Sequence, residues 1–76
     1  MNKVRRNELQ KALDHLSEAK ELLENVRNEE QDAFDNLPEG LQNADKGQAM
    51  EQAVQYLDEA IGQLEDVEST INDASA

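Results

Sequence analysis

Apolar residues recur along most of the chain at the spacing of a helical heptad, in which positions a and d form one stripe. With Leu9 placed at position a, the a column holds mainly leucine and the d column mainly alanine. In the first stripe the a column is Leu9, Leu16, Leu23, Glu30 and Leu37, and the d column is Ala12, Ala19, Val26 and Ala33. In the second stripe, with the frame started again at Met50, the a column is Met50, Leu57, Leu64 and Ile71, and the d column is Ala53, Ala60, Val67 and Ala74. Two such stripes predict two long amphipathic helices.

The stretch between the stripes predicts where the helices end. Pro38 lacks an N–H and disfavours helical geometry in the residue before it, so the first helix is expected to end near Asn36. Asn36 with Glu39 three residues later, and Asp45 with Gln48, have the form of N-terminal capping boxes. The predicted elements are a helix over 3–35, a capped turn over 36–45 and a helix over 46–73.

A connection this short predicts that the two helices pack side by side in opposite directions, as a single all-α domain over 1–76. Alanine at most d positions lets the backbones approach closely, so the expected seam is a tight, alanine-rich coiled coil. Residues 11–26 and 52–67 share seven identities in sixteen positions. An internal duplication would explain this likeness. The same residues being required at the same seam positions of two packed helices would explain it equally well.

One flank of the predicted seam is more apolar than the other. In an antiparallel pair the e positions of both helices lie on the same side, and their apolar members are Leu13, Phe34, Val54 and Ile61. Two helices do not cover this flank as well as their stripes, and chains of this size bury only ~60% of their unfolded surface. We therefore expect a homodimer that buries these four residues in a four-helix bundle. Lys20 and Arg27 are expected at its edge, meeting acids of the other chain.

Charge is distributed unevenly and changes the picture of possible partners. The net charge is −11, yet residues 1–27 carry six of the seven Lys and Arg against five acids, and residues 28–76 carry thirteen acids against Lys46 alone. Nucleic-acid backbones and anionic membranes attract clustered cations, so direct binding to either is disfavoured. No run of ~18 apolar residues and no signal peptide is recognisable, which favours a cytoplasmic protein.

The residue types needed for enzyme or metal chemistry are sparse. There is no cysteine, and His15 is the only histidine, without a Glu-x-x-His spacing or a second imidazole for zinc. The acidic runs over 28–36 and 66–73 lack the ligand order and central glycine of a calcium loop. We therefore expect no catalytic, metal or cofactor site, and a protein that is not an enzyme.

The central turn is the most distinctive part of the sequence. It matches the pattern E-x-x-A-x-D-N-L-P-E-x-L-Q-x-S-x-x-G at Glu30, Ala33, Asp35, Asn36, Leu37, Pro38, Glu39, Leu41, Gln42 and Gly47, with Ala44 in place of the serine. In this turn and its flanking helices the chain resembles small acidic helical proteins encoded by phages and prophages of Gram-positive bacteria. The resemblance implies a genomic setting and no mechanism.

Two functions from different classes fit these features. The first is a structural or adaptor protein, a dimeric bundle whose acidic outer surface contacts a basic protein. The second is an inhibitor whose carboxylates imitate nucleic-acid phosphates and occupy the groove of a DNA-binding protein. The residues expected to contact a partner are Asn36, Glu39 and Gln42 in the turn and Glu51, Asp58 and Glu65 along the second helix.

Overall fold

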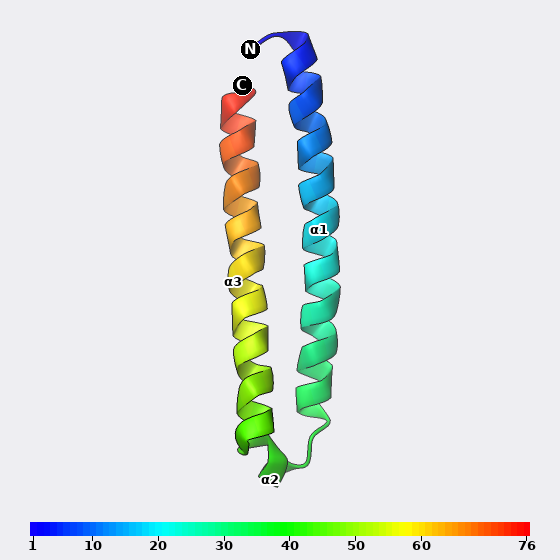
Figure 1. Ribbon diagram of the computed structural model, residues 1–76, viewed down its shortest axis with the longest axis vertical. Coiled ribbons are helices and arrows are strands. Elements are labelled where there is room, and N and C mark those ends of the chain that lie inside the picture. Colours follow the sequence, from blue (N-terminus) through cyan, green and yellow to red (C-terminus); the bar gives the residue numbers. More distant parts are fainter.

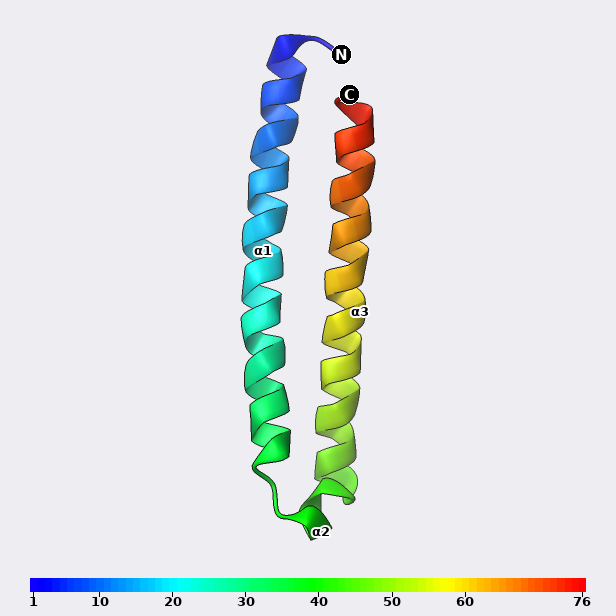
Figure 2. The same cartoon turned by 180° about the vertical axis from the view of Figure 1, so that it is seen from behind.

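The computed structural model describes residues 1–76 and contains only helices. Helix α1 spans Lys3–Asp35, the short helix α2 spans Glu39–Gln42, and helix α3 spans Asp45–Ala74. Helices α1 and α3 lie side by side and run in opposite directions, with α2 at the turn and both chain ends at the other end (Figure 1, Figure 2). The molecule is a rod of 58 × 15 × 12 Å. The prediction of an all-α chain is confirmed, and both long helices begin and end within one residue of the predicted positions.

The helix ends are capped differently from the prediction. Neither predicted capping box forms: Asn36 is the C-cap residue of α1, and the residue before α3 is Ala44, whose extended backbone provides no side-chain cap. Asp45 is already helical, so it places its carboxylate in the first turn, where negative charge is favourable to the helix dipole. The side-chain cap that does form is at Asn2, whose Oδ1 accepts a hydrogen bond from the Arg5 N–H at 2.8 Å.

The seam between α1 and α3 is centred on the a and e columns, whereas the sequence predicted a and d. Every a residue is half-buried, and so are the e residues Leu13, Phe34 and Ile61. The d column is half-buried only in the first part of each helix. Its later members are exposed: Val26, Ala33, Val67 and Ala74.

Helix geometry explains this shift. A straight α-helix has 3.6 residues per turn, so a strict seven-residue pattern rotates by ~20° per heptad around it. The rotation carries the d column away from the neighbouring helix toward each C-terminus, and it carries the e column inward. Because α1 and α3 are nearly straight, no supercoil compensates for this rotation (Figure 1). Val26 and Val67, which the heptad placed in the core, therefore lie outside it.

Little of the chain is fully buried. Val54 is the only buried hydrophobic residue, with 6% of its surface exposed, and the only other buried residue is Gly47. A long two-helix rod has no interior layer, so most seam residues keep one edge in water. The hairpin therefore depends on a thin line of contacts.

The turn is held by several short-range hydrogen bonds. The Pro38 carbonyl accepts from the N–H groups of Leu41 and Gln42 at 2.8 and 3.1 Å, and this closes the single turn of α2. The side-chain amide of Gln42 donates to the Phe34 carbonyl at 3.2 Å, which joins α2 to the end of α1. These bonds fix the path of the chain from α1 into α3.

Gly47 is the position where this turn requires a glycine. A Cβ atom at Gly47 would meet the backbone carbonyl group of Gln42, whose carbon would lie at 2.6 Å. Gly62, which the heptad places in the middle of the second helix, has open space around it. The close approach of two backbones therefore occurs where α2 turns into α3.

Candidate interaction surfaces

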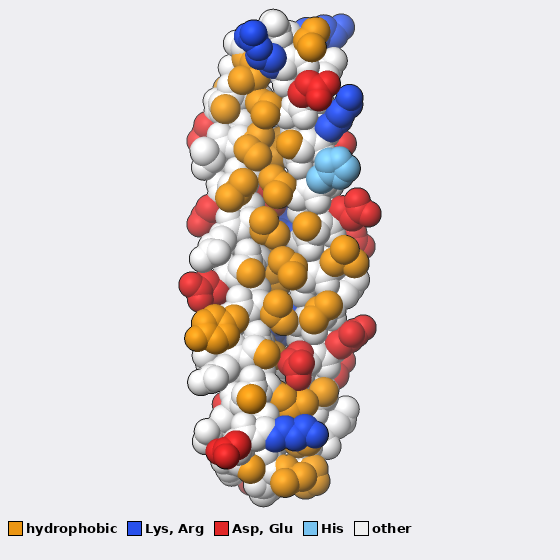
Figure 3. Space-filling model, in the orientation of Figure 1, with side chains coloured by type: hydrophobic (Ala, Val, Ile, Leu, Met, Phe, Trp, Pro, Cys, Tyr) orange, Lys and Arg blue, Asp and Glu red, His pale blue; other side chains and the backbone are white.

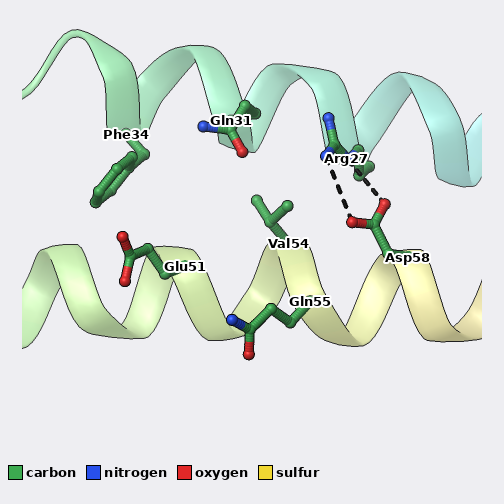
Figure 4. Close-up of a pocket in the computed structure, with 7 residues that line it drawn as sticks. All are labelled: Arg27, Gln31, Phe34, Glu51, Val54, Gln55 and Asp58. Atoms are coloured by element: carbon green, nitrogen blue, oxygen red, sulfur yellow. Dashed lines mark hydrogen bonds and ion pairs between the residues drawn. The ribbon is translucent and has the colours of Figure 1, made fainter.

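A shallow groove of about 330 Å³ lies along the e side of the hairpin, between the second half of α1 and the first half of α3. Figure 4 shows Phe34 above Glu51 at one end, Val54 pointing toward α1 in the middle, and the Arg27–Asp58 pair at the other end. The remaining lining residues are Gln31 and Gln55. The groove is open and mainly polar, so it offers hydrogen-bonding groups without the enclosed, water-excluded environment that catalysis favours.

Arg27 crosses the seam to bind Asp58. Its Nε donates to Asp58 Oδ1 at 2.8 Å and its Nη2 to Oδ2 at 3.4 Å, which is the two-point geometry that guanidinium and carboxylate groups favour. The hydrogen bond to Asp58 raises the pKa of Arg27, against a smaller opposing effect of desolvation. The guanidinium is therefore already engaged, and Asp58 is not a free anion.

Lys20 makes the second contact of this kind, one heptad earlier in α1. Its Nζ lies 2.9 Å from Glu68 Oε1, and both side chains are about three-quarters covered. The hydrogen bond from Lys20 to Glu68 raises the lysine pKa, desolvation lowers it by less, and the charges of Glu68, Glu65 and Glu24 raise it further. Two e-column cations are thus paired with acids of their own chain.

This pairing corrects the sequence-based expectation for Lys20 and Arg27, which placed both at a dimer edge facing acids of another chain. The e column rotates into the seam, so their nearest acids are those of α3 in the same molecule. The basic residues Lys3, Arg5 and Arg6 at the start of α1 form no ion pair. The cross-helix ion pairs instead lie in the middle of the rod.

The four residues predicted for the dimer interface all lie toward this seam. Val54 is buried within one chain, and Leu13, Phe34 and Ile61 are half-buried. Most of their apolar surface is therefore covered by the other helix of the hairpin and contributes little to a contact with another molecule. The homodimer itself stays a prediction.

The residues predicted to contact a partner are separated by the fold into two groups. In the turn, Asn36 and Glu39 are exposed. Gln42 is half-buried, and its side-chain amide donates a hydrogen bond to the Phe34 carbonyl. Along α3, Glu51 lines the groove and Glu65 is exposed, whereas Asp58 between them is paired with Arg27. The expected row of free carboxylates is therefore interrupted at its centre.

Sequence reasoning missed the most conspicuous surface, which lies on the opposite side of the seam from the groove. The d and g columns of both helices form this surface, and four large apolar side chains on it are exposed. They are Leu22, Val26, Tyr56 and Val67, at 61, 50, 69 and 44%. Figure 3 shows hydrophobic side chains along nearly the whole length of one side of the rod, over both helices. A 3.6-residue wheel, drawn in place of the heptad, would have moved Val26 and Val67 out of the core.

The one histidine and the acidic side chains do not form a cluster of metal ligands in the structure. His15 is exposed on α1, and no group of three or more His, Asp or Glu side chains is close enough to hold a metal ion. No helix has the length and apolar character required to cross a membrane. The apolar surface and the charged groove are therefore the two features that call for a functional explanation.

Comparisons with protein-family models, with curated proteins and with solved structures found no match to this chain.

Proposed function

We propose that this protein is a non-enzymatic interaction protein, a helical hairpin that pairs with a second copy in a four-helix bundle and binds a basic protein through its acidic outer surface. The observation that supports binding through the acidic surface most directly is that most carboxylates on α3 are exposed and unpaired. Eight acidic residues lie on this helix, and only Asp58 and Glu68 have an ion-pair partner. The other six are exposed.

Unpaired carboxylates along one helix favour a partner with clustered Lys or Arg. Complementary charge accelerates association and selects among partners more than it adds affinity. Exposed charges interact over a Debye length of ~8 Å at physiological salt, so such binding weakens as salt is raised. The phage or prophage origin that the turn sequence predicts stays a prediction.

Affinity capture from a lysate of the encoding organism, followed by mass spectrometry, tests this function. The wild-type chain is compared with the triple variant Glu51→Gln, Glu65→Gln and Asp66→Asn at low and high salt. We expect basic proteins that the wild type retains at low salt and that the variant and high salt release. Equal retention by both chains would contradict the proposal.

A charge-matched control separates the α3 surface from total charge. Asp14→Asn, Glu18→Gln and Glu21→Gln remove the same number of exposed acids from α1, and this variant is expected to retain the partner. Duplex DNA added to the captured complex tests the nucleic-acid-mimic alternative. A mimic's target is displaced by DNA, whereas the partner of an adaptor is not.

A further inference from the structure

The exposed apolar surface of the d and g columns has no partner within the chain. Leu22 and Val26 of α1 and Tyr56 and Val67 of α3 are 44 to 69% exposed, although they are large apolar side chains. Alanines occupy the other d positions. Ala33 and Ala74 are exposed, and Ala12, Ala19, Ala53 and Ala60 are half-buried. The surface runs along both helices, and its large apolar side chains lie among small ones and the exposed polar g residues His15, Glu29, Asn36, Gln63 and Thr70. Such a surface permits close helix packing by knobs into holes.

The total exposed area indicates how much contact is missing. The chain exposes 5576 Å² at a mass of 8.5 kDa, whereas a compact monomer of this mass exposes about 4,700 Å². The excess of about 900 Å² is close to the ~800 Å² that each partner buries in a stable interface of standard size. Covering one side of the hairpin with a second layer of helices of the same length would therefore bring its exposed area close to that of a compact protein of this mass.

We propose that a second copy of this chain covers the d/g surface, which makes this surface, and not the e flank, the interface of the four-helix bundle. The assignment rests on the homodimer of the proposed function and specifies the surface that forms it. A second copy matches the 58 Å length of the rod and presents the same alternation of large side chains and alanine. The e flank is unsuitable because Lys20 and Arg27 are paired with acids of α3 and Val54 is already buried within the hairpin.

Charge selects the orientation of the two copies. Helix α3 carries eight acids against Lys46, a formal charge of −7, and α1 carries nine acids against six cations, a formal charge of −3. Four of these six cations, at Lys3, Arg5, Arg6 and Lys11, lie in the first third of α1. Placing α3 against α3 would oppose two helices of −7, which is costly at close range.

Placing α1 of each copy against α3 of the other avoids this repulsion. Every helix then runs antiparallel to its neighbours, and both turns lie at the same end of the bundle. The basic start of one copy lies beside the acidic end of α3 in the other, near Asp66 and Asp73. The dimer thus offers acids to Lys3, Arg5 and Arg6, which form no ion pair within the single hairpin.

Sedimentation equilibrium at micromolar concentration tests the surface. Wild type is expected at about twice 8.5 kDa. The double variant Leu22→Glu and Tyr56→Glu is expected to raise the dimer Kd roughly 100-fold or more, because burying carboxylates in an apolar contact is strongly unfavourable. The matched control Asn28→Glu and Ser69→Glu adds the same two charges at exposed positions facing away from the surface, and it should remain dimeric.

Each outcome of this experiment decides the question. A monomeric wild type overturns the inference and leaves the d/g surface to a different partner, while partner capture still tests the acidic surface separately. Equal dimerisation by the double variant and the control would place the contact elsewhere. The homodimer would then be supported, and the d/g surface would be rejected as its interface. Circular dichroism of each variant at high concentration verifies that the helices remain formed.

A spin label tests the orientation. The chain has no cysteine, so Asn43→Cys places one label in the exposed turn of each copy. Turns at the same end give a distance between labels well under half of the 58 Å rod, as measured by double electron–electron resonance. Turns at opposite ends give a distance that approaches the full length of the rod, and this result would overturn the α1-to-α3 arrangement.

Discussion

The e and d columns of the heptad differ in where they lie, although both are spaced alike in the sequence. The e column holds Gly47, the buried Val54 and the two cations that cross the seam, and it lies between the helices. The d column holds Val26 and Val67, which are half exposed on the outer surface. The sequence pattern defines a stripe, and the straightness of the two helices decides which edge of that stripe is covered.

The largest expected effect within the e column is at Gly47. Gly47→Ala is expected to lower the free energy of unfolding by about 3 kcal/mol, because its Cβ meets the Gln42 carbonyl group and backbone cannot move aside as a side chain does. The matched change Gly62→Ala lies in open space in the same helix and should raise it by about 0.5–1 kcal/mol. Urea unfolding followed by circular dichroism measures both changes. Equal effects at the two glycines would show that the turn adjusts freely.

A valine-to-alanine substitution can be made in both columns, at Val54 in the e column and at Val26 in the d column. Val54→Ala is expected to cost about 2 kcal/mol in a urea titration, since it removes two buried methyl groups and leaves a gap in the seam. Val26→Ala is expected to change the stability of the dissociated hairpin by less than about 0.5 kcal/mol, because half of this side chain is exposed. If the d/g surface is the dimer contact, the effect of Val26→Ala grows with protein concentration while that of Val54→Ala does not. An equal cost at low concentration would mean that both columns belong to one core.

The smallest expected effect concerns the charged members of the e column and appears at alkaline pH. The hydrogen bond to Glu68 raises the pKa of Lys20 in the folded chain, so the stabilisation from this pair is complete below the unfolded lysine pKa of about 10.4 and is lost as pH rises through the folded value. Thermal unfolding of wild type and Lys20→Gln between pH 8 and about pH 11.5 should give melting temperatures that converge at the alkaline end. A constant difference across this range would assign the effect of Lys20 to packing of its aliphatic stem.

Particular residues show how far the sequence predicts this fold. The bounds of α1 and α3 follow from local chemistry, since the apolar period identifies the helices and Pro38 ends the first of them. The capping boxes at Asn36 and Asp45 were wrong because the hydrogen bonds of the turn are made by the Pro38 carbonyl and the Gln42 side chain. Asn36 instead closes the end of α1, where its N–H donates to the Asp32 carbonyl, and α2 begins only after Pro38.

The interaction surfaces were less predictable for a related reason. Exposed acids on α3 are evident from composition, but only the pairing of Asp58 with Arg27 across 31 residues reveals which carboxylates are neutralised. The open surface around Tyr56 and Leu22 was hidden because its d-column members had been counted as core. A heptad assigns positions relative to a supercoiled axis, and the two straight helices do not follow such an axis.

The sequence by itself determined that this chain forms two long helices joined by a proline-containing turn, and that its second half is strongly acidic, because periodicity and charge are local properties of the chain. Only the tertiary structure decided which edge of the apolar stripe is buried, which charges are paired and why Gly47 must lack a side chain. The buried edge and the cross-helix ion pairs depend on the rotation and approach of α1 and α3, which lie far apart in the sequence. The requirement at Gly47 depends on how closely α2 packs against the start of α3. No single helix contains that information.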